Sequence, residues 1–262
     1  MPTLLRHQGE HFIVTGAGTG IGRAIALRLA QEGATLSLLA RDTTRLEVTA
    51  RAAMKAGAGA VHLGPCDIRD RRTVDDAFDE CANVMGPIRG LVANAGIGGP
   101  NEPGRGDRFD DLVQTNVVGT YSCLRAAQRH LEPGPTTRHL VVVSSILGRF
   151  GVPGYTGYCA SKAALLGLVR AMALEVASDH VQVNARCPGW VDTEMSRAGI
   201  QAMADAMGQS YEQALAGAMS AVPMGRMSRP EDIAGVVAWL VGPDARGVTG
   251  QGIDVNGGAW MG

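Results

Sequence analysis

Tyr158 and Lys162 are the residues whose types and spacing most directly suggest acid–base chemistry. They stand four positions apart in a segment of strong helical character, so both side chains emerge on one face of a helix. A free phenol has a pKa of about 10 and is a poor base at neutral pH. Because a nearby ammonium favours the phenolate, the pair predicts a tyrosine that exchanges a proton with a substrate oxygen. Taken singly, Tyr158 also suits an amphipathic helix and Lys162 a solvated surface.

A glycine-rich turn, residues 15–22, follows the apolar run at 11–15 and leads into a helical pattern. Its glycines would let the backbone turn tightly and bring N–H groups up to a pyrophosphate at the helix start. The predicted contact residues in this turn are Gly16, Thr19, Gly20, Ile21 and Gly22. The G-x-G-x-x-G spacing is not satisfied, so a plain strand-to-helix turn is an alternative, but the position at the first such junction favours a dinucleotide.

Two later strand ends should line the same crevice. Asp67 and Ile68 follow the third strand, where a carboxylate can accept a hydrogen bond from an adenine amino group; capping of the next helix is the alternative role for Asp67. The segment Asn94, Ala95 and Gly96 follows the fourth strand, where small residues would let the backbone approach a ribose.

The elements that must position these residues alternate between short apolar runs and amphipathic helical segments. The predicted strands are 11–15, 34–40, 60–63, 90–94, 139–145, 181–185 and 251–255. Nearly continuous apolar strands separated by helices indicate a parallel sheet covered on both faces. The sequence therefore predicts an α/β, doubly wound, Rossmann-type fold.

Residues 190–228 interrupt this rhythm with methionine-rich, helix-like stretches that also hold Trp190 and Tyr211. The methionines considered are Met195, Met203, Met207, Met219 and Met224. Because the insertion follows the carboxyl end of a strand, where open α/β sheets bind ligands, it suggests a substrate lid. A surface excursion or subunit contact is the alternative, and methionine at helical spacing is also common in ordinary core. Without a Pro- or Ser-rich linker, residues 1–262 are expected to form one domain.

Composition narrows the classes of protein. The chain has 262 residues, 45% hydrophobic and 19% charged, with a formal net charge of −1, which offers no electrostatic footprint for nucleic acid or an anionic membrane. No stretch reaches the roughly 20 apolar residues that cross a bilayer, and a cytoplasmic protein is expected. The five cysteines form no C-x-x-C pair, so reduced, mostly buried thiols and no metal site are expected.

Taken together, these residues resemble the short-chain dehydrogenase/reductase superfamily over nearly the whole chain, from residue 11 to 258. The matching features are the T-G-x-x-x-G-x-G turn, Asn94-Ala95-Gly96, Asn116, Ser145, Tyr158 with Lys162, and Pro188-Gly189 followed by Thr193. The resemblance implies a seven-stranded parallel sheet and a homotetramer. One departure is Ala93, where the family commonly has a second asparagine, and this puts a local hydrogen bond in question.

The resemblance also implies roles for individual residues. Ser145, thirteen residues before Tyr158, would hydrogen-bond the substrate oxygen, and its neighbour Ser144 would be structural. Asn116 would hold a water in the proton path to Lys162, which would also hold the nicotinamide ribose. The positive charge of the nicotinamide would favour the phenolate of Tyr158 together with the Lys162 ammonium. The backbone of residues 188–193 would pack along the nicotinamide, and Val191 and Thr193 would meet its carboxamide. Predicted contacts in this segment are Pro188, Gly189, Val191 and Thr193.

The choice of nicotinamide depends on the end of the second strand. Where NAD-preferring members of the family carry an aspartate, this chain has Ala40 followed by Arg41. An acid would repel a 2′-phosphate, whereas arginine offers it a planar fork of donors, so NADP(H) is favoured and NAD(H) is the alternative. Asp42 tempers this because it could turn toward a ribose or cap the next helix.

The sequence is thus interpreted as an oxidoreductase acting on a small-molecule carbonyl or alcohol. Residues 210–226 look like those of 3-oxoacyl reductases and aromatic polyketide ketoreductases, which favours ketone reduction on an apolar or acyl-type substrate. The alternative enzyme oxidises a secondary or cyclic alcohol with NAD. A third possibility is a non-catalytic, cofactor-sensing regulator, in which Tyr158 or Lys162 would be expected to be lost.

Overall fold

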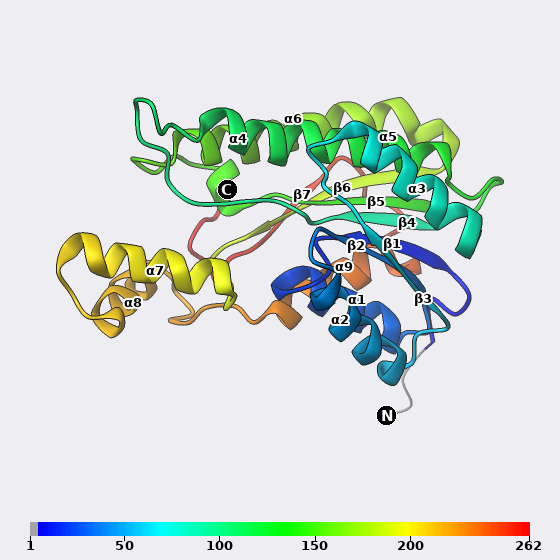
Figure 1. Ribbon diagram of the computed structural model, residues 1–262, viewed down its shortest axis with the longest axis horizontal. Helices are drawn as coiled ribbons and strands as arrows, with labels where there is room; N and C mark the ends of the chain where they lie inside the picture. Colours follow the sequence, from blue (N-terminus) through cyan, green and yellow to red (C-terminus); the bar gives the residue numbers. More distant parts are fainter. Residues whose placement is uncertain (1–4) are drawn as a thin grey trace.

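The computed structural model describes residues 5–262, which contain one sheet of seven parallel strands (Figure 1). The strands are β1 (His11–Thr15), β2 (Thr35–Ala40), β3 (Val61–Pro65), β4 (Gly90–Ala93), β5 (Arg138–Val143), β6 (Val181–Pro188) and β7 (Gly252–Val255). Their order, β3-β2-β1-β4-β5-β6-β7, reverses its winding between β1 and β4, and this opens a crevice outside the carboxyl ends of the strands. The doubly wound fold with seven strands is confirmed. Residues 1–4 of the predicted domain lie outside the described residues.

Helices cover both faces of the sheet (Figure 1). One face carries α1 (Gly20–Gln31), α2 (Thr43–Ala56) and α9 (Pro230–Leu240). The other carries α3 (Arg71–Met85), α5 (Thr120–Arg129) and α6 (Thr156–Val176). A short α4 (Phe109–Val113) runs into α5 through a π-helical turn, Gln114–Gly119, and 3₁₀ turns lie at Ile146–Gly148, Ala177–Asp179 and Pro243–Ala245.

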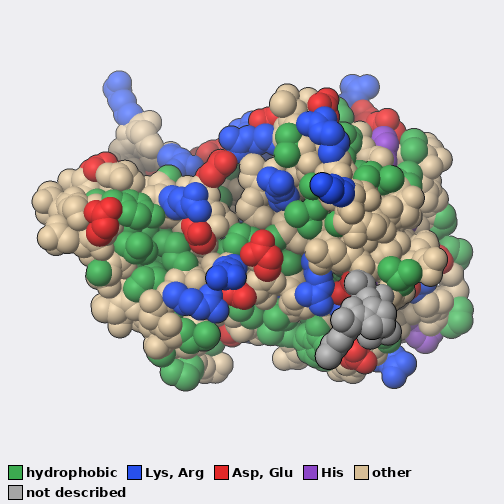
Figure 2. Space-filling model, turned by 90° about the horizontal axis from the view of Figure 1, so that it is seen from below, with side chains coloured by type: hydrophobic (Ala, Val, Ile, Leu, Met, Phe, Trp, Pro, Cys, Tyr) green, Lys and Arg blue, Asp and Glu red, His purple; other side chains and the backbone are tan. Residues whose placement is uncertain are grey.

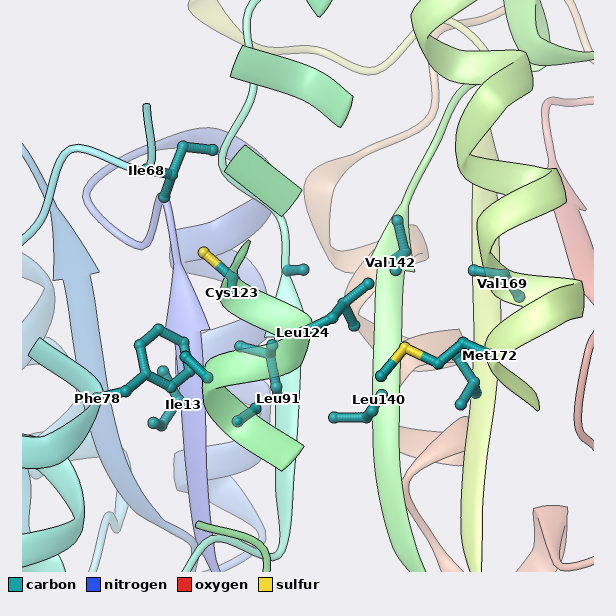
Figure 3. Packing of buried hydrophobic residues seen from close by; sticks show 14 of the residues in the cluster. Ile13, Ile68, Phe78, Leu91, Cys123, Leu124, Leu140, Val142, Val169 and Met172 are labelled. Carbon is teal, nitrogen blue, oxygen red and sulfur yellow. The ribbon is translucent and has the colours of Figure 1, made fainter. Parts of the chain in front are cut away.

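The strands are apolar on both faces because each face has its own buried core. Ile13 of β1 packs toward Phe78 of α3 and Leu124 of α5 (Figure 3). Its neighbours Phe12 and Val14 face the opposite core, beneath α1 and α9. Successive residues of a strand point to opposite faces, so a single run of β1 residues serves both cores.

Two aspartates explain where helices begin. Asp42 accepts from Arg45 N at 3.1 Å and caps α2, which was one of its two expected roles. Asp70 accepts from Arg72 N at 2.9 Å and caps α3. Capping by Asp67, the alternative considered for that residue, is therefore wrong.

Strand ends differ from prediction near the crevice. β5 ends at Val143, two residues earlier than expected, because Ser145 already begins the 3₁₀ turn and its Oγ accepts from Leu147 N. β6 instead continues to Pro188, because residues 185–188 pair with β7. Ser145 therefore stands just beyond the sheet.

The insertion forms two helices, α7 (Glu194–Met207) and α8 (Tyr211–Ser220), beyond the carboxyl ends of the strands (Figure 1). They enclose a small cluster of their own, in which Met203 and Trp190 pack around Ile200 and Ala204. Met203 is thus ordinary core, whereas Met195 is half-exposed and lies at the crevice.

Charges are mixed on the face formed by α1, α2 and α9, where basic and acidic side chains are interspersed (Figure 2). Within residues 5–262, no helix is long and apolar enough to cross a membrane, and no cluster of three His, Cys, Asp or Glu residues could hold a metal ion. All five cysteines are free thiols, and four are buried.

Buried histidines at the amino ends of the strands make stability depend on pH. His139 in β5 is 5% exposed, and burial lowers its pKa to about 4; burial also lowers the pKa of His11. The folded protein therefore favours the neutral imidazoles. Their contribution to the free energy of unfolding is complete above the unfolded pKa of about 6.5, and it falls as the pH drops toward 4.

We expect the free energy of unfolding to fall by about 2 kcal/mol between pH 7.5 and 5 through His139 alone. Urea denaturation at both pH values measures this loss, which His139→Gln should reduce. The control His180→Asn changes an exposed histidine at a left-handed position, φ 57°, and should keep the pH dependence. An equal pH dependence in wild type and His139→Gln would contradict the assignment.

Candidate active site

A cleft of about 480 Å³ runs along the carboxyl ends of the strands and is bounded on one side by the start of α7. The predicted residues that line it are Gly16, Thr19, Gly20, Ile21, Arg41, Asp67, Ile68, Asn94, Ala95, Gly96, Ser145, Tyr158, Lys162, Pro188, Gly189, Val191 and Thr193. Gly22 and Asn116 do not line it and lie behind its wall. One cleft therefore brings together segments spread over nearly 180 positions of the chain, from Gly16 to Thr193.

The glycine-rich turn is shaped by close backbone packing. Gly16 and Gly20 have positive φ angles of 65° and 51°, which favour glycine. A Cβ on Gly22 would stand 2.2 Å from the Gly16 carbonyl oxygen. Asn94 Nδ2 donates to the carbonyl of Thr15 at 3.0 Å and ties the turn to the end of β4.

This turn fits a pyrophosphate. The Thr19 side chain makes no capping bond to α1, so the first N–H groups of that helix remain available to a ligand in the cleft. A Cβ on Gly20 would stand 3.1 Å from Thr193 Cγ2, so a side chain there would fill the narrow space between the turn and the residue that precedes α7.

Ser145, Tyr158 and Lys162 converge at the other end of the cleft. Ser145 Oγ accepts from Leu147 N at 3.1 Å, which leaves its O–H free to donate. Lys162 lies one helical turn after Tyr158, with Nζ 5.7 Å from the phenol ring centre and donating to the Val143 carbonyl at 3.0 Å. Ser144 Oγ donates to the Lys162 carbonyl at 2.8 Å, a structural contact of the kind expected for that residue.

Burial shifts the pKa values of both Tyr158 and Lys162. Burial raises the pKa of the phenol, and hydrogen bonding with Ser145 opposes this only in part. Burial also lowers the pKa of Lys162 to about 8. The predicted shift of Tyr158 toward phenolate also involves the positive charge of a bound nicotinamide, and it stays a prediction.

The side chain of Asn116 links two segments of the protein through hydrogen bonds. Its Oδ1 accepts from Ile97 N at 2.9 Å, and its Nδ2 donates to the Ile97 carbonyl at 2.9 Å and to Ser161 Oγ at 3.1 Å. These contacts lock the loop after β4 against α6. The side chain is thus occupied by protein partners, and a bound water would have to use other atoms.

The end of the cleft beside β2 and β3 is rich in arginine. Asp67 accepts a bidentate hydrogen bond from Arg69, with the shortest contact 2.6 Å, and this bond lowers the pKa of Asp67. Arg41 lies close enough to contribute to the same lowering. Among residues 5–262, Arg41 has no ion-pair partner, and its guanidinium is available to an anion.

Several lining residues were not identifiable from sequence. Met195 was noted only as one of several methionines, yet a Cβ on Gly98 would stand 2.9 Å from its Sδ and 3.6 Å from Tyr158 Cε2. Arg45 and Glu194 also line the cleft, 149 positions apart in the chain. Among these missed residues, Arg69 could most readily have been found from the sequence, because it follows the predicted contact residue Asp67 by two positions.

Comparisons with known proteins agree with this architecture. The family model described as enoyl-(acyl carrier protein) reductase matches residues 16–259. The 3-oxoacyl-(acyl-carrier-protein) reductase FabG of Haemophilus influenzae is 33% identical over 256 residues, covering 97% of this chain and 99% of that protein.

Two solved structures are also similar. A variant of actinorhodin polyketide ketoreductase with NADPH has a TM-score of 0.88 and 33% identity, covering 95% of this chain and 97% of that one. A short chain dehydrogenase from Burkholderia cenocepacia in complex with NADP has a TM-score of 0.84 and 31% identity, covering 97% and 99%. By sequence, fold and family model, this chain belongs to the short-chain dehydrogenase/reductase family of oxidoreductases.

Proposed function

We propose that this chain reduces a ketone on an acyl-type or other apolar substrate to a secondary alcohol with NADPH. The main support for this proposal is that two hydroxyl donors, Ser145 and Tyr158, lie beside Lys162 in the cleft that also contains the glycine-rich turn. Two donors directed at one position suit a carbonyl oxygen that gains negative charge during reduction.

The residues present fit a dinucleotide along the cleft. The turn at residues 16–22 would hold the pyrophosphate, residues 188–193 would lie along the nicotinamide, and Lys162 would hold its ribose. When bound, the nicotinamide supplies the hydride that reaches the carbonyl carbon.

Ser145 and Tyr158 then act on the oxygen. Ser145 donates its free O–H and polarises the carbonyl, and Tyr158 delivers its proton as negative charge develops. Tyr158 is protonated at neutral pH, because burial raises the pKa of its phenol above the ordinary value, and it can therefore act as the acid of ketone reduction. Lys162, behind the phenol, stabilises the tyrosinate that remains after transfer.

The substrate class is supported by Met195 and by the relatives. Met195 places a flexible apolar side chain beside Gly98 and Tyr158. The H. influenzae relative is named for 3-oxoacyl reduction, and the similar solved ketoreductase for a polyketide. Both names describe a ketone on an acyl chain.

A screen of ketones and secondary alcohols with both nicotinamides tests the proposal. We expect the highest kcat/KM for an apolar or 3-oxoacyl ketone with NADPH. Oxidation of alcohols with NAD as the dominant activity would support the alternative dehydrogenase. Tight nucleotide binding with no turnover of any pair would support the non-catalytic regulator.

Arg41 should set part of the preference for NADP(H). We expect Arg41→Ala to lower the NADPH/NADH ratio of kcat/KM about tenfold, or roughly 1.5 kcal/mol, the lower end for a charge-assisted bond because the residue is exposed. The paired change Ala40→Asp with Arg41→Ala should move preference toward NAD(H). Steady-state kinetics with both cofactors measure the ratio, and an unchanged ratio in Arg41→Ala would refute the role.

The proposal extends to assembly and location. We propose a homotetramer in the cytoplasm, supported by the family and by exposed apolar residues such as Leu174, Val118 and Tyr121 on and beside α5 and α6. Light scattering that gives a stable monomer would contradict the assembly.

A further inference from the structure

The end of the cleft beside β2 and β3 holds a second arginine, whose partner belongs to the predicted lid. Arg45, in the first turn of α2, donates from Nη1 to Glu194 Oε2 at 2.9 Å. Glu194 is the first residue of α7. The ion pair therefore connects α2, on one wall of the cleft, with α7, the helix that begins the predicted lid on the other wall.

Arg45 lies directly beside the glycine-rich turn. A Cβ on Gly18 would stand 3.0 Å from Arg45 Cβ, and Thr49, one turn later, donates from Oγ1 to the Gly18 carbonyl at 3.4 Å. On the other side, Thr193 approaches Gly20 of the same turn. Arg45 and Glu194 thus meet where the phosphates of a dinucleotide are expected.

The charges of this region are unevenly paired. Asp67 is held by Arg69, and Asp42 caps α2 and lies 3.3 Å from Arg45 Nε. Glu194 is the third carboxylate, and it pairs with Arg45 through a different guanidinium nitrogen, Nη1, whereas Arg41 has no ion-pair partner in residues 5–262. A 2′-phosphate beside Arg41 would meet one available guanidinium and a second, that of Arg45, which the carboxylates of Asp42 and Glu194 already contact.

We propose that Glu194 competes with the cofactor's 2′-phosphate for Arg45. On this proposal, which rests on the proposed use of NADP(H), Arg45 is a second determinant of selectivity and the start of the lid takes part in choosing the nucleotide. A nucleotide without the 2′-phosphate leaves the Arg45–Glu194 pair intact. A 2′-phosphate that bonds Arg45 Nη1 would displace Glu194, because this nitrogen already donates to Glu194 Oε2.

The competition predicts opposite effects for the two partners. Glu194→Gln removes the competing charge and should tighten binding of 2′,5′-ADP about threefold, the scale of an exposed ion pair. Arg45→Ala should weaken that binding about tenfold. The double variant should match Arg45→Ala, because without Arg45 there is nothing for Glu194 to occupy.

Isothermal titration calorimetry of the full-length variants with 2′,5′-ADP and with 5′-AMP tests this without catalysis. Binding of 5′-AMP should change little in any variant. Asp205→Asn is the matched control, since it removes the same charge from the same helix about 16 Å further along and its carboxylate contacts Gln201. It should leave both affinities unchanged.

The outcomes separate the two proposals. Stronger wild-type binding of 2′,5′-ADP than of 5′-AMP, with opposite shifts in Glu194→Gln and Arg45→Ala, supports the competition. If the wild type shows this preference but the variants change the affinities for both nucleotides equally, or change neither, the role of Arg45 and Glu194 is overturned. The proposed use of NADP(H) would then still stand. A wild type that binds both nucleotides equally overturns the proposed cofactor and the competition with it.

Discussion

Tyr158→Phe is expected to lower kcat by about 10² to 10⁴ while leaving nucleotide affinity close to wild type. The substitution removes the transferable proton and keeps the ring in the wall of the cleft, so the loss should fall on chemistry. The affinity can be followed by calorimetry with NADP⁺, separately from turnover.

Tyr155→Phe is the matched control for this change. Tyr155 stands at the N-cap of α6, three residues earlier, and does not line the cleft. The same loss of a hydroxyl there should leave kcat within a few-fold. A Tyr158→Phe enzyme with near-normal kcat would exclude the phenol as the proton donor.

Ser145→Ala is expected to lower kcat by about 10² to 10³, the range for loss of one donor to a developing oxyanion. The Oγ accepts one bond from Leu147 N and lines the cleft, so its O–H remains able to donate there and the expected loss falls on contact with the substrate. Nucleotide affinity should again change little.

Ser144→Ala discriminates between the two neighbouring serines. Ser144 Oγ donates to the Lys162 carbonyl, so this substitution should mainly reduce stability, by roughly 1 kcal/mol. Thermal denaturation and kcat should be measured for both variants. If Ser144→Ala carried the larger loss of kcat, the assignment of the polarising hydroxyl would move to Ser144.

The fold was predictable because its main signals are local. The apolar run at 11–15 coincides with β1 residue for residue, since a strand covered on both faces needs a continuous apolar stretch. The turn after it also fits, because only glycine tolerates the 2.2 Å approach at Gly22. Resemblance to a family supplied the number of strands.

Other features depend on tertiary contacts that no local pattern contains. The end of β5 before Ser145 follows from the 3₁₀ turn, and the raised pKa of Tyr158 follows from burial by neighbouring segments. Asp67 and Asp70 both suit a cap by type, and the backbone geometry at Asp70 decides between them. The Arg45–Glu194 pair joins exposed residues 149 positions apart, which sequence spacing cannot relate.

Hydride transfer itself can be observed with NADPH carrying deuterium at C4 of the nicotinamide. Purified enzyme should convert the best ketone of the screen to an alcohol with one deuterium on the carbinol carbon, as read by mass spectrometry and NMR. Tyr158→Phe should form that alcohol at least about a hundred times more slowly. Formation of the alcohol without deuterium from either C4 position, or equal rates in both proteins, would contradict direct hydride transfer assisted by Tyr158.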